Sequence, residues 1–421
     1  MNALPVQVEP DMRHLTTLDE LGRHITLLAR VEESDAPFIS AYLNLENGQA
    51  GWRDTLDQRA AILRRVLRGN DLIDLDEALD KIEVWLASKL LPETKGVAIF
   101  VRGTFGGAFM LPMQFAAPLP NMIAAYPTPY IYHLVELKDN YHRYIVLLAR
   151  PDQASILEVN LGAATTQAWI RRSDLRMRVG SEWTRFHYQV HQAHRGDRFV
   201  QEKIALLQQL MHAGGQTHLI LAGDPWITAR IRQALPDDLA HKLVDLMPAT
   251  VHHQQADVVM ATLSRFIEHE EQESRSVADR LIEGLLSQNL AVAGSAATLD
   301  ALRWSEVDTL VMCSDYRPDP GWACMSCRAM GIEAPEIPVC RQCGEATVRP
   351  VDIREVLLRL AGQLGRPVEV VERSEALLSL GGVGCLLRYR PESVPAHRSR
   401  SPSDSGDCSE GKPQESDFLV I

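Results

Sequence analysis

The sequence predicts a mixed α/β fold built from three consecutive α/β domains. Short apolar, β-prone runs such as PFISAYLNL (37–45) alternate with stretches of helical spacing along most of the chain. The 421 residues leave room for several domains that each bury a core. A composition of 46% hydrophobic and 23% charged residues is ordinary for a globular protein. Two C-x-x-C knuckles interrupt the last α/β segment.

The first domain is expected at 17–138, after a flexible arm at 1–16 that carries no periodic pattern. Its pattern predicts a helix, a strand, two amphipathic helices and a buried strand at 17–31, 37–45, 52–69, 75–91 and 96–101. An edge strand should follow at 109–120, because its prolines limit ladder pairing. The repeated prolines of AAYPTPYIY (124–132) predict a linking stretch.

The central domain is expected at 139–273. Two strands joined at Pro151 and Asp152 should form a hairpin, with a third strand at 164–170. A helix at 198–213, a strand at 217–223, a helix capped by Asp224 and a strand at 242–247 complete the alternation.

One long helical pattern at 254–288 should bridge the central and third domains. The third domain, at 274–390, is expected to be an α/β/α sandwich. Its predicted strands lie at 290–294, 307–313, 368–372 and 384–390, with helices at 298–304 and 351–365 between them. Residues 391–421 are rich in Ser and Pro and predict a disordered tail.

The knuckles predict a zinc ribbon inserted into the third domain at 320–348. Two C-x-x-C turns separated by twelve residues supply the four sulfurs of a tetrahedral structural zinc site. The ligands would be Cys324, Cys327, Cys340 and Cys343. The alternative is a set of unrelated buried or redox thiols. With four protein ligands the ion would have no open position for catalysis.

The remaining sequence-wide features favour a cytoplasmic protein. Cys313, Cys385 and Cys408 are single, which fits a reducing compartment. No apolar run approaches the length of a membrane-spanning helix, and the first residues lack a signal-peptide pattern.

A net charge of −12 argues against a general nucleic-acid coat protein, yet one stretch is basic. Between Arg171 and Arg198 lie seven arginines, which could neutralise phosphates, while Trp183 and Tyr188 could stack on unpaired bases. The alternative is a solvated helix face with one core aromatic. His187, His191 and His194 share a helical face, where a polar surface is favoured over a second metal site.

Three blocks of the third domain resemble the C-terminal domain of archaeal and eukaryotic class I release factors and of Pelota. They are LDALRWSEVDTLVMCSDY (299–316), the cysteine insertion and SLGGVGCLLRYR (379–390). The resemblance extends back through AVAGSAATLDAL and THLILAG to about residue 140, and residues 17–135 match by layout. Within this superfamily the bacterial branch, which includes the Balon-type ribosome hibernation factors, fits best.

The resemblance implies a factor that mimics tRNA in the ribosomal A site. The first domain would reach the decoding centre, and a loop of the central domain would reach the peptidyl-transferase centre. The third domain would contact a translational GTPase and the stalk base.

The central loop departs from the release-factor pattern. Release factors carry Gly-Gly-Gln there, followed by a segment that ends in Arg-Phe. This chain reads RVGSEWTRFHYQ (178–189), and alignment on Arg185-Phe186 puts Val179-Gly180-Ser181 at the tripeptide. The missing Gln argues against peptide release. The absence of an Asn-Ile-Lys-Ser sequence leaves stop-codon decoding unsupported.

The sequence therefore predicts a monomeric A-site binder that acts in ribosome hibernation or rescue without peptidyl-tRNA hydrolysis. No catalytic residue is assigned, and structural zinc is the only cofactor expected. Contacts to rRNA of the A site and peptidyl-transferase centre are assigned to Arg171, Arg172, Arg176, Arg178, Gly180, Ser181, Trp183, Arg185 and Arg195. One alternative is a peptidyl-tRNA or tRNA hydrolase that uses Ser181 and Glu182. Another is a non-ribosomal adaptor protein.

Overall fold

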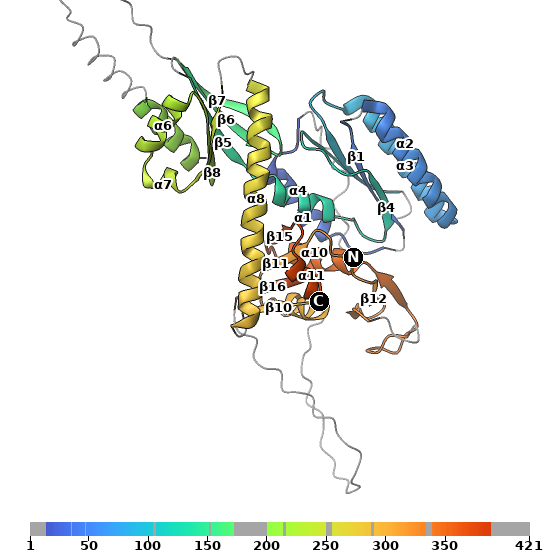
Figure 1. Ribbon diagram of the computed structural model, residues 1–421. Helices are drawn as coiled ribbons and strands as arrows, with labels where there is room; N and C mark the ends of the chain where they lie inside the picture. Colours follow the sequence, from blue (N-terminus) through green and yellow to red (C-terminus); the bar gives the residue numbers. More distant parts are fainter. Residues whose placement is uncertain are drawn as a thin grey trace, which may run out of the picture.

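The computed structural model has a mixed α/β fold, as predicted, and the residues it describes form four sheets (Figure 1). It describes residues 14–388 except 35, 47, 104–106, 151–152, 172–199, 214–215, 250–254, 288–289 and 334–338. Most of the expected N-terminal arm and the whole expected disordered tail lie outside the described residues. The division into folding units at 138 and 273 stays a prediction.

The first sheet is antiparallel and has the strand order β3-β2-β1-β4. Its strands are β1 (Phe38–Asn44), β2 (Gly96–Arg102), β3 (Phe109–Phe115) and β4 (Met122–Tyr126). β3 lies at an edge, as its proline predicts. The prediction of a linking stretch from residue 124 is wrong for its first residues. They finish β4, which pairs with β1, and the prolines that suggested a linker follow the strand.

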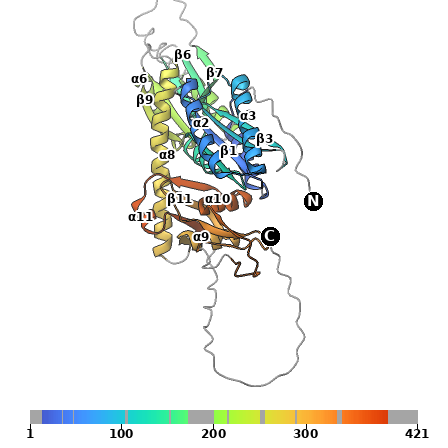
Figure 2. The same ribbon diagram turned by 90° about the vertical axis from the view of Figure 1, so that its right-hand side faces the viewer.

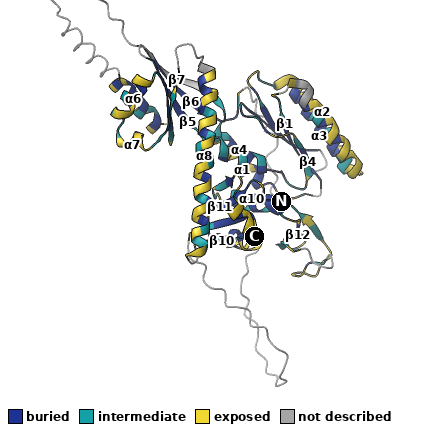
Figure 3. Cartoon of the chain, in the orientation of Figure 1, coloured by how far each residue is buried: buried dark blue, intermediate teal, exposed yellow. Residues whose placement is uncertain are grey.

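Side chains of β1 are buried on both faces of the sheet, which explains its unbroken apolar run. Ile39, Ala41 and Leu43 face the core formed with α2 (Gly48–Val66) and α3 (Asn70–Lys89). The outer sides of these two helices are exposed (Figure 3).

The opposite face of the first sheet shares one hydrophobic core with the third sheet. Phe38 and Tyr42 belong to this core, together with side chains of α1 (Leu18–Ala29) and α4 (Tyr132–Asn140). Helix α4 was not predicted, because its short apolar pattern follows directly on prolines. Helix α1 matches its prediction and begins with a capping box, in which Thr17 and Glu20 bond to each other's backbone N–H.

The central sheet has the order β7-β6-β5-β8-β9, with β5, β8 and β9 parallel to one another. Its strands are β5 (Tyr144–Ala149), β6 (Gln153–Asn160), β7 (Ala163–Arg171), β8 (His218–Gly223) and β9 (Leu243–Pro248). The predicted hairpin is the β5–β6 pair.

One face of the central sheet packs against the helix at 200–213 and α6 (Pro225–Ala234), followed by the short α7 (Asp237–Ala240). As predicted, Asp224 caps α6, since its carboxylate accepts hydrogen bonds from the N–H groups of Trp226 and Ile227.

Helix α8 (Gln255–Leu286) covers the other face of the central sheet and continues to the third sheet, as predicted (Figures 1 and 2). Its first half contributes Phe266, whose ring stacks on Tyr144 with centroids 4.3 Å apart. Its second half contributes Ala278 and Leu281 to the core of the third sheet.

The third sheet has the order β10-β16-β11-β15. Its strands are β10 (Ala291–Ala293), β11 (Val307–Cys313), β15 (Val368–Val371) and β16 (Val383–Leu387), accompanied by α9 (Ser295–Arg303), α10 (Ile353–Gln363) and α11 (Glu375–Ser379). Gly384 allows β16 to approach β10 closely, because a Cβ there would lie 2.5 Å from the carbonyl oxygen of Val292. Cys385 is fully buried in this strand.

The ribbon is a separate sheet of order β13-β12-β14, inserted between β11 and α10. Its strands are β12 (Gly321–Cys324), β13 (Met330–Gly331) and β14 (Val348–Val351). Among the described residues, no helix combines the length and apolar character that crossing a membrane requires.

Helix α4 is fixed at both ends to the third domain by buried carboxyl groups. Glu355 of α10 accepts hydrogen bonds from the N–H groups of Ile131 (2.8 Å) and Tyr132 (3.0 Å). At the other end, Asp139 accepts a 2.6 Å hydrogen bond from Val370 N–H in the edge strand β15. Burial raises the pKa of both carboxyl groups to about 8, and for Asp139 the nearby Glu369 adds to the rise.

We predict that the stability of the protein falls between pH 5 and pH 8, and that Glu355→Gln flattens this fall. In that range the folded state keeps a proton on Glu355 that the unfolded chain has released, so stability decreases as pH rises. One such proton contributes a slope of up to about 1.4 kcal/mol per pH unit. Urea unfolding at several pH values measures the slope. The matched control is the exposed Glu83→Gln on α3, and equal slopes in wild type and Glu355→Gln would refute the assignment.

Candidate functional site

The two C-x-x-C knuckles bring four sulfur atoms to one point. The Sγ atoms of Cys324, Cys327, Cys340 and Cys343 all lie within 4.8 Å of one another. The Cys324–Cys343 pair is 3.6 Å apart, and the Cys327–Cys340 pair is 3.5 Å apart. A tetrahedral zinc ion with bonds of about 2.3 Å places its sulfurs about 3.8 Å apart. The cluster therefore fits the zinc ribbon that the spacing predicts.

Both knuckles use the same backbone turn. The N–H of Arg328 donates to the carbonyl of Cys324 at 2.9 Å, and the N–H of Gly344 donates to the carbonyl of Cys340 at 2.9 Å. The residue that closes each turn has a positive φ, 60° at Arg328 and 78° at Gly344. Glycine adopts this region without steric cost, whereas the first knuckle places an arginine there.

Local hydrogen bonds favour a thiolate at Cys324. The Thr347 hydroxyl lies 3.4 Å from Cys324 Sγ and 2.9 Å from the Ser326 hydroxyl. The Thr347 hydroxyl and nearby backbone N–H groups lower the pKa of the Cys324 thiol to about 6. The thiolate is the form that binds zinc.

The ribbon is tied to the rest of the third domain and to the segment after α1. Arg303 of α9 donates a 2.7 Å hydrogen bond to the carbonyl of Met330 in β13. Arg349 in β14 forms a 2.5 Å ion pair with Glu33. With four cysteine ligands, a zinc ion would hold these strands together and would offer no position to a substrate.

The predicted RNA-binding residues lie at the end of β7 and beyond it. Arg171 is the last residue of β7, and the other eight candidates fall in 172–199, outside the described residues. His187, His191 and His194 lie there as well. The two ends of this segment are fixed by β7 and by the helix that starts at residue 200. Arg171 pairs with Gln153, at the end of the sheet away from the third domain (Figure 1).

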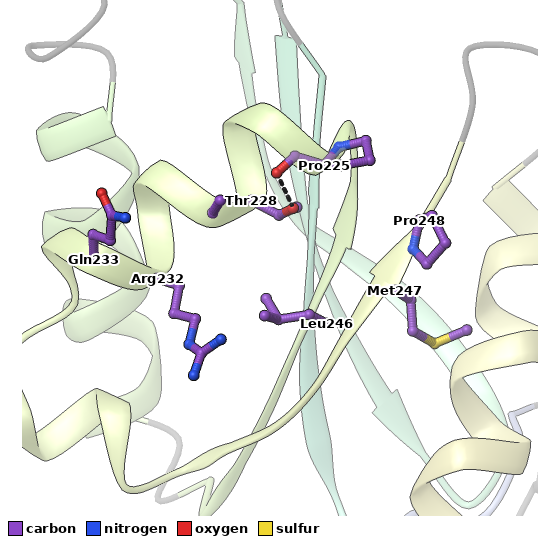
Figure 4. A pocket seen from close by; sticks show the side chains of 8 residues that line it. Pro225, Thr228, Arg232, Gln233, Leu246, Met247 and Pro248 are labelled. Carbon is purple, nitrogen blue, oxygen red and sulfur yellow. Dashed lines mark hydrogen bonds between the residues drawn. The ribbon is translucent and has the colours of Figure 1, made fainter.

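An open groove of about 620 Å³ lies between α6 and β9 (Figure 4). Thr228, Arg232, Leu246 and Met247 are among its lining residues. The Thr228 hydroxyl donates to the backbone carbonyl of Pro225 at 3.2 Å. Among the lining residues that the structure describes, Arg232 is the one ionisable side chain, and these residues supply no acid–base pair for hydrolysis.

The structure also brings together His218, His269 and Glu273, which the sequence analysis did not single out. The available signal was the spacing of His269 and Glu273 on α8, which puts them one turn apart on one helix face. His218 lies some fifty residues earlier, and only the packing of α8 on the central sheet reveals its proximity.

We predict that the purified protein holds zinc at the ribbon and that Cys343→Ser releases it. Loss of one of four thiolates should lower zinc affinity by at least tenfold and unfold the ribbon locally. Metal content by plasma mass spectrometry and a thiol-accessibility assay measure both effects. Cys408→Ser is the control, and zinc retention in Cys343→Ser equal to that control would contradict the ligand assignment.

Residues 129–266 match the sequence model of a family described as bacterial archaeo-eukaryotic release factor family 10. The match contains the whole central sheet, the segment 172–199 and the first part of α8. A comparison with curated proteins found no match.

Solved structures of release factors and Pelota proteins cover most of the chain at low identity. The archaeal translation termination factor aRF1 has 14% identity, with 90% of this chain and 99% of that chain covered and a TM-score of 0.24. Pelota from Archaeoglobus fulgidus has 12% identity, with 89% of this chain and 93% of that chain covered, and a TM-score of 0.35. A ribosome-bound archaeal Pelota has 14% identity, with 89% of this chain and 95% of that chain covered, and a TM-score of 0.38. Scores of this size establish no common domain arrangement. The family match confirms the resemblance to the bacterial branch of the release factor and Pelota superfamily.

Proposed function

We propose that this protein is a ribosome-associated translation factor that occupies the A site without hydrolysing peptidyl-tRNA. One observation carries the proposal. The family match spans residues 129–266, and within it the alignment on Arg185-Phe186 puts Val179-Gly180-Ser181 where release factors carry Gly-Gly-Gln. Without the Gln, the segment lacks the side chain that positions the attacking water in release factors.

The length of α8, which runs from the central sheet to the third sheet, supports this function. The segment 172–199 follows Arg171 at the end of β7 and precedes the 200–213 helix. Helix α8 has 32 residues and is therefore roughly 48 Å long at 1.5 Å per residue. It runs from the β7 end of the central sheet to the third domain, so these two parts lie far apart (Figure 1). Such an extended chain suits a factor that contacts two distant parts of a large particle.

The charge pattern supports a local contact with rRNA. The chain as a whole is acidic, with a net charge of −12, so non-specific attraction to RNA is weak. The arginines at 171, 172, 176, 178, 185 and 195 concentrate positive charge in one segment, and Trp183 adds a stacking surface.

The finer parts of the proposal follow from the same resemblance. The protein would act as a monomer in the cytoplasm, on idle or stalled ribosomes, in hibernation or rescue. A translational GTPase would deliver it through the third domain. The zinc ion would stabilise the ribbon and take no part in chemistry.

We predict that the full-length protein sediments with purified 70S ribosomes and that Arg178→Glu/Arg185→Glu weakens binding at least tenfold. Charge reversal replaces phosphate attraction by repulsion, and the effect should shrink as salt increases. The matched control is Arg280→Glu, an exposed arginine of α8. Wild-type protein that stays in the supernatant at physiological salt would instead favour the adaptor alternative.

We further predict that the protein releases no peptide from ribosomes loaded with peptidyl-tRNA. A release-factor protein assayed in parallel provides the positive control, and Glu182→Ala should behave as wild type. Release by the wild type that is lost in Glu182→Ala would support the hydrolase alternative.

A further inference from the structure

A cluster of imidazole and carboxylate groups lies where α8 crosses the central sheet. His218 is the first residue of β8 and shares the sheet face of Ile220, because side chains alternate along a strand. Its ring lies edge-on to Phe266 of α8, with centroids 5.3 Å apart. His269 and Glu273 follow Phe266 at i+3 and i+7, so the same helix face presents them to β8.

The distances within this cluster match those around a bound metal ion. His269 Nε2 lies 3.3 Å from Glu273 Oε1, and His218 Nε2 lies 3.7 Å from Glu273 Oε2. One ligand atom from each of the three residues can be chosen so that all lie within 4.8 Å of one another. Bonds of about 2.1 Å to one ion require ligand atoms roughly 3.0–3.5 Å apart, so small side-chain adjustments suffice.

A fourth residue, Glu270, is incompletely satisfied at this point. Its side chain is 8% exposed, and Oε1 has no hydrogen-bond partner. Its other oxygen, Oε2, lies 2.7 Å from His142 Nδ1, while Oε1 lies 3.8 Å from His218 Nε2. A buried carboxylate oxygen without a partner is costly, and a cation beside His218 would satisfy it.

The charge balance also favours a cation. Among the described residues, no lysine or arginine forms an ion pair with Glu270 or Glu273, whose neighbours are the histidines. Two imidazoles with one carboxylate form a common ligand set for divalent transition metals, and they differ from the soft thiolates of the ribbon.

We propose that His218, His269 and Glu273, supported by Glu270, form a second metal site for a divalent transition-metal ion such as Zn²⁺. The ion would join β8 of the central sheet to α8 just before α8 reaches the third domain, where Ser274 donates a hydrogen bond to Glu369 in β15. The ion would therefore fix the angle at which α8 leaves the central sheet. This site is independent of the proposed ribosomal function.

The test counts Zn²⁺ bound to the full-length protein after equilibrium dialysis. Wild type should bind two ions per chain, and His269→Ala and Glu273→Gln should each bind one. In either variant the affinity of the α8 site for Zn²⁺ should fall at least about tenfold. His241→Ala, an exposed histidine after α7, is the matched control and should keep both ions.

Two further variants locate each ion and test whether His187, in the segment 172–199, binds one of them. Cys343→Ser should keep the ion at α8, and His187→Ala should keep both. A second readout is the thermal midpoint, which added Zn²⁺ should raise in Cys343→Ser but not in Cys343→Ser/Glu273→Gln. One ion per chain in wild type, or two ions in both His269→Ala and Glu273→Gln, would overturn the proposal.

Discussion

Helix α4 connects the first sheet to the third domain, and two buried carboxyl groups fix its position. Glu355 accepts hydrogen bonds from the N–H groups of Ile131 and Tyr132 at the start of the helix, and Asp139 accepts the N–H of Val370 at its other end. The guanidinium of Arg354 lies over the Tyr132 ring at 4.0 Å, which covers the same junction. Because the groups are buried among apolar side chains, losing either partner would leave an unsatisfied polar atom in the core. The first and third sheets therefore keep one relative arrangement.

The shared core also places the ribbon. Arg349 in β14 reaches Glu33 after α1, and α10, which supplies Glu355, begins directly after β14. A zinc ion at the four cysteines would thus stabilise an insertion whose base touches both the first and third sheets. The described residues of that insertion bury few apolar side chains, so a bound metal would stabilise it in place of a core.

Helix α8 joins the central sheet to the third sheet and carries two residues of the proposed second metal site. One half of it packs on the central sheet and the other half on the third sheet, so the angle at which it leaves the central sheet sets the distance between their far ends. The cluster of His218, His269 and Glu273 lies at that point of exit. For a factor proposed to contact two separate parts of the ribosome, that angle determines whether both contacts form at once.

The sequence by itself determined most of the order of elements, the long bridging helix, the cap at Asp224 and the four cysteines that lie close together. Each of these depends on local spacing: helical or strand periodicity, a capping side chain, or two C-x-x-C turns. It missed α4 and misread the start of AAYPTPYIY, because nearby prolines mask a short strand and a helix that are stabilised mainly by tertiary packing. Tertiary structure alone decided that the first and third sheets share a core, that Glu355 caps a helix more than two hundred residues away, and that His218 meets α8. These contacts join residues far apart in the chain, and no periodicity within a segment records which distant segment will cover it.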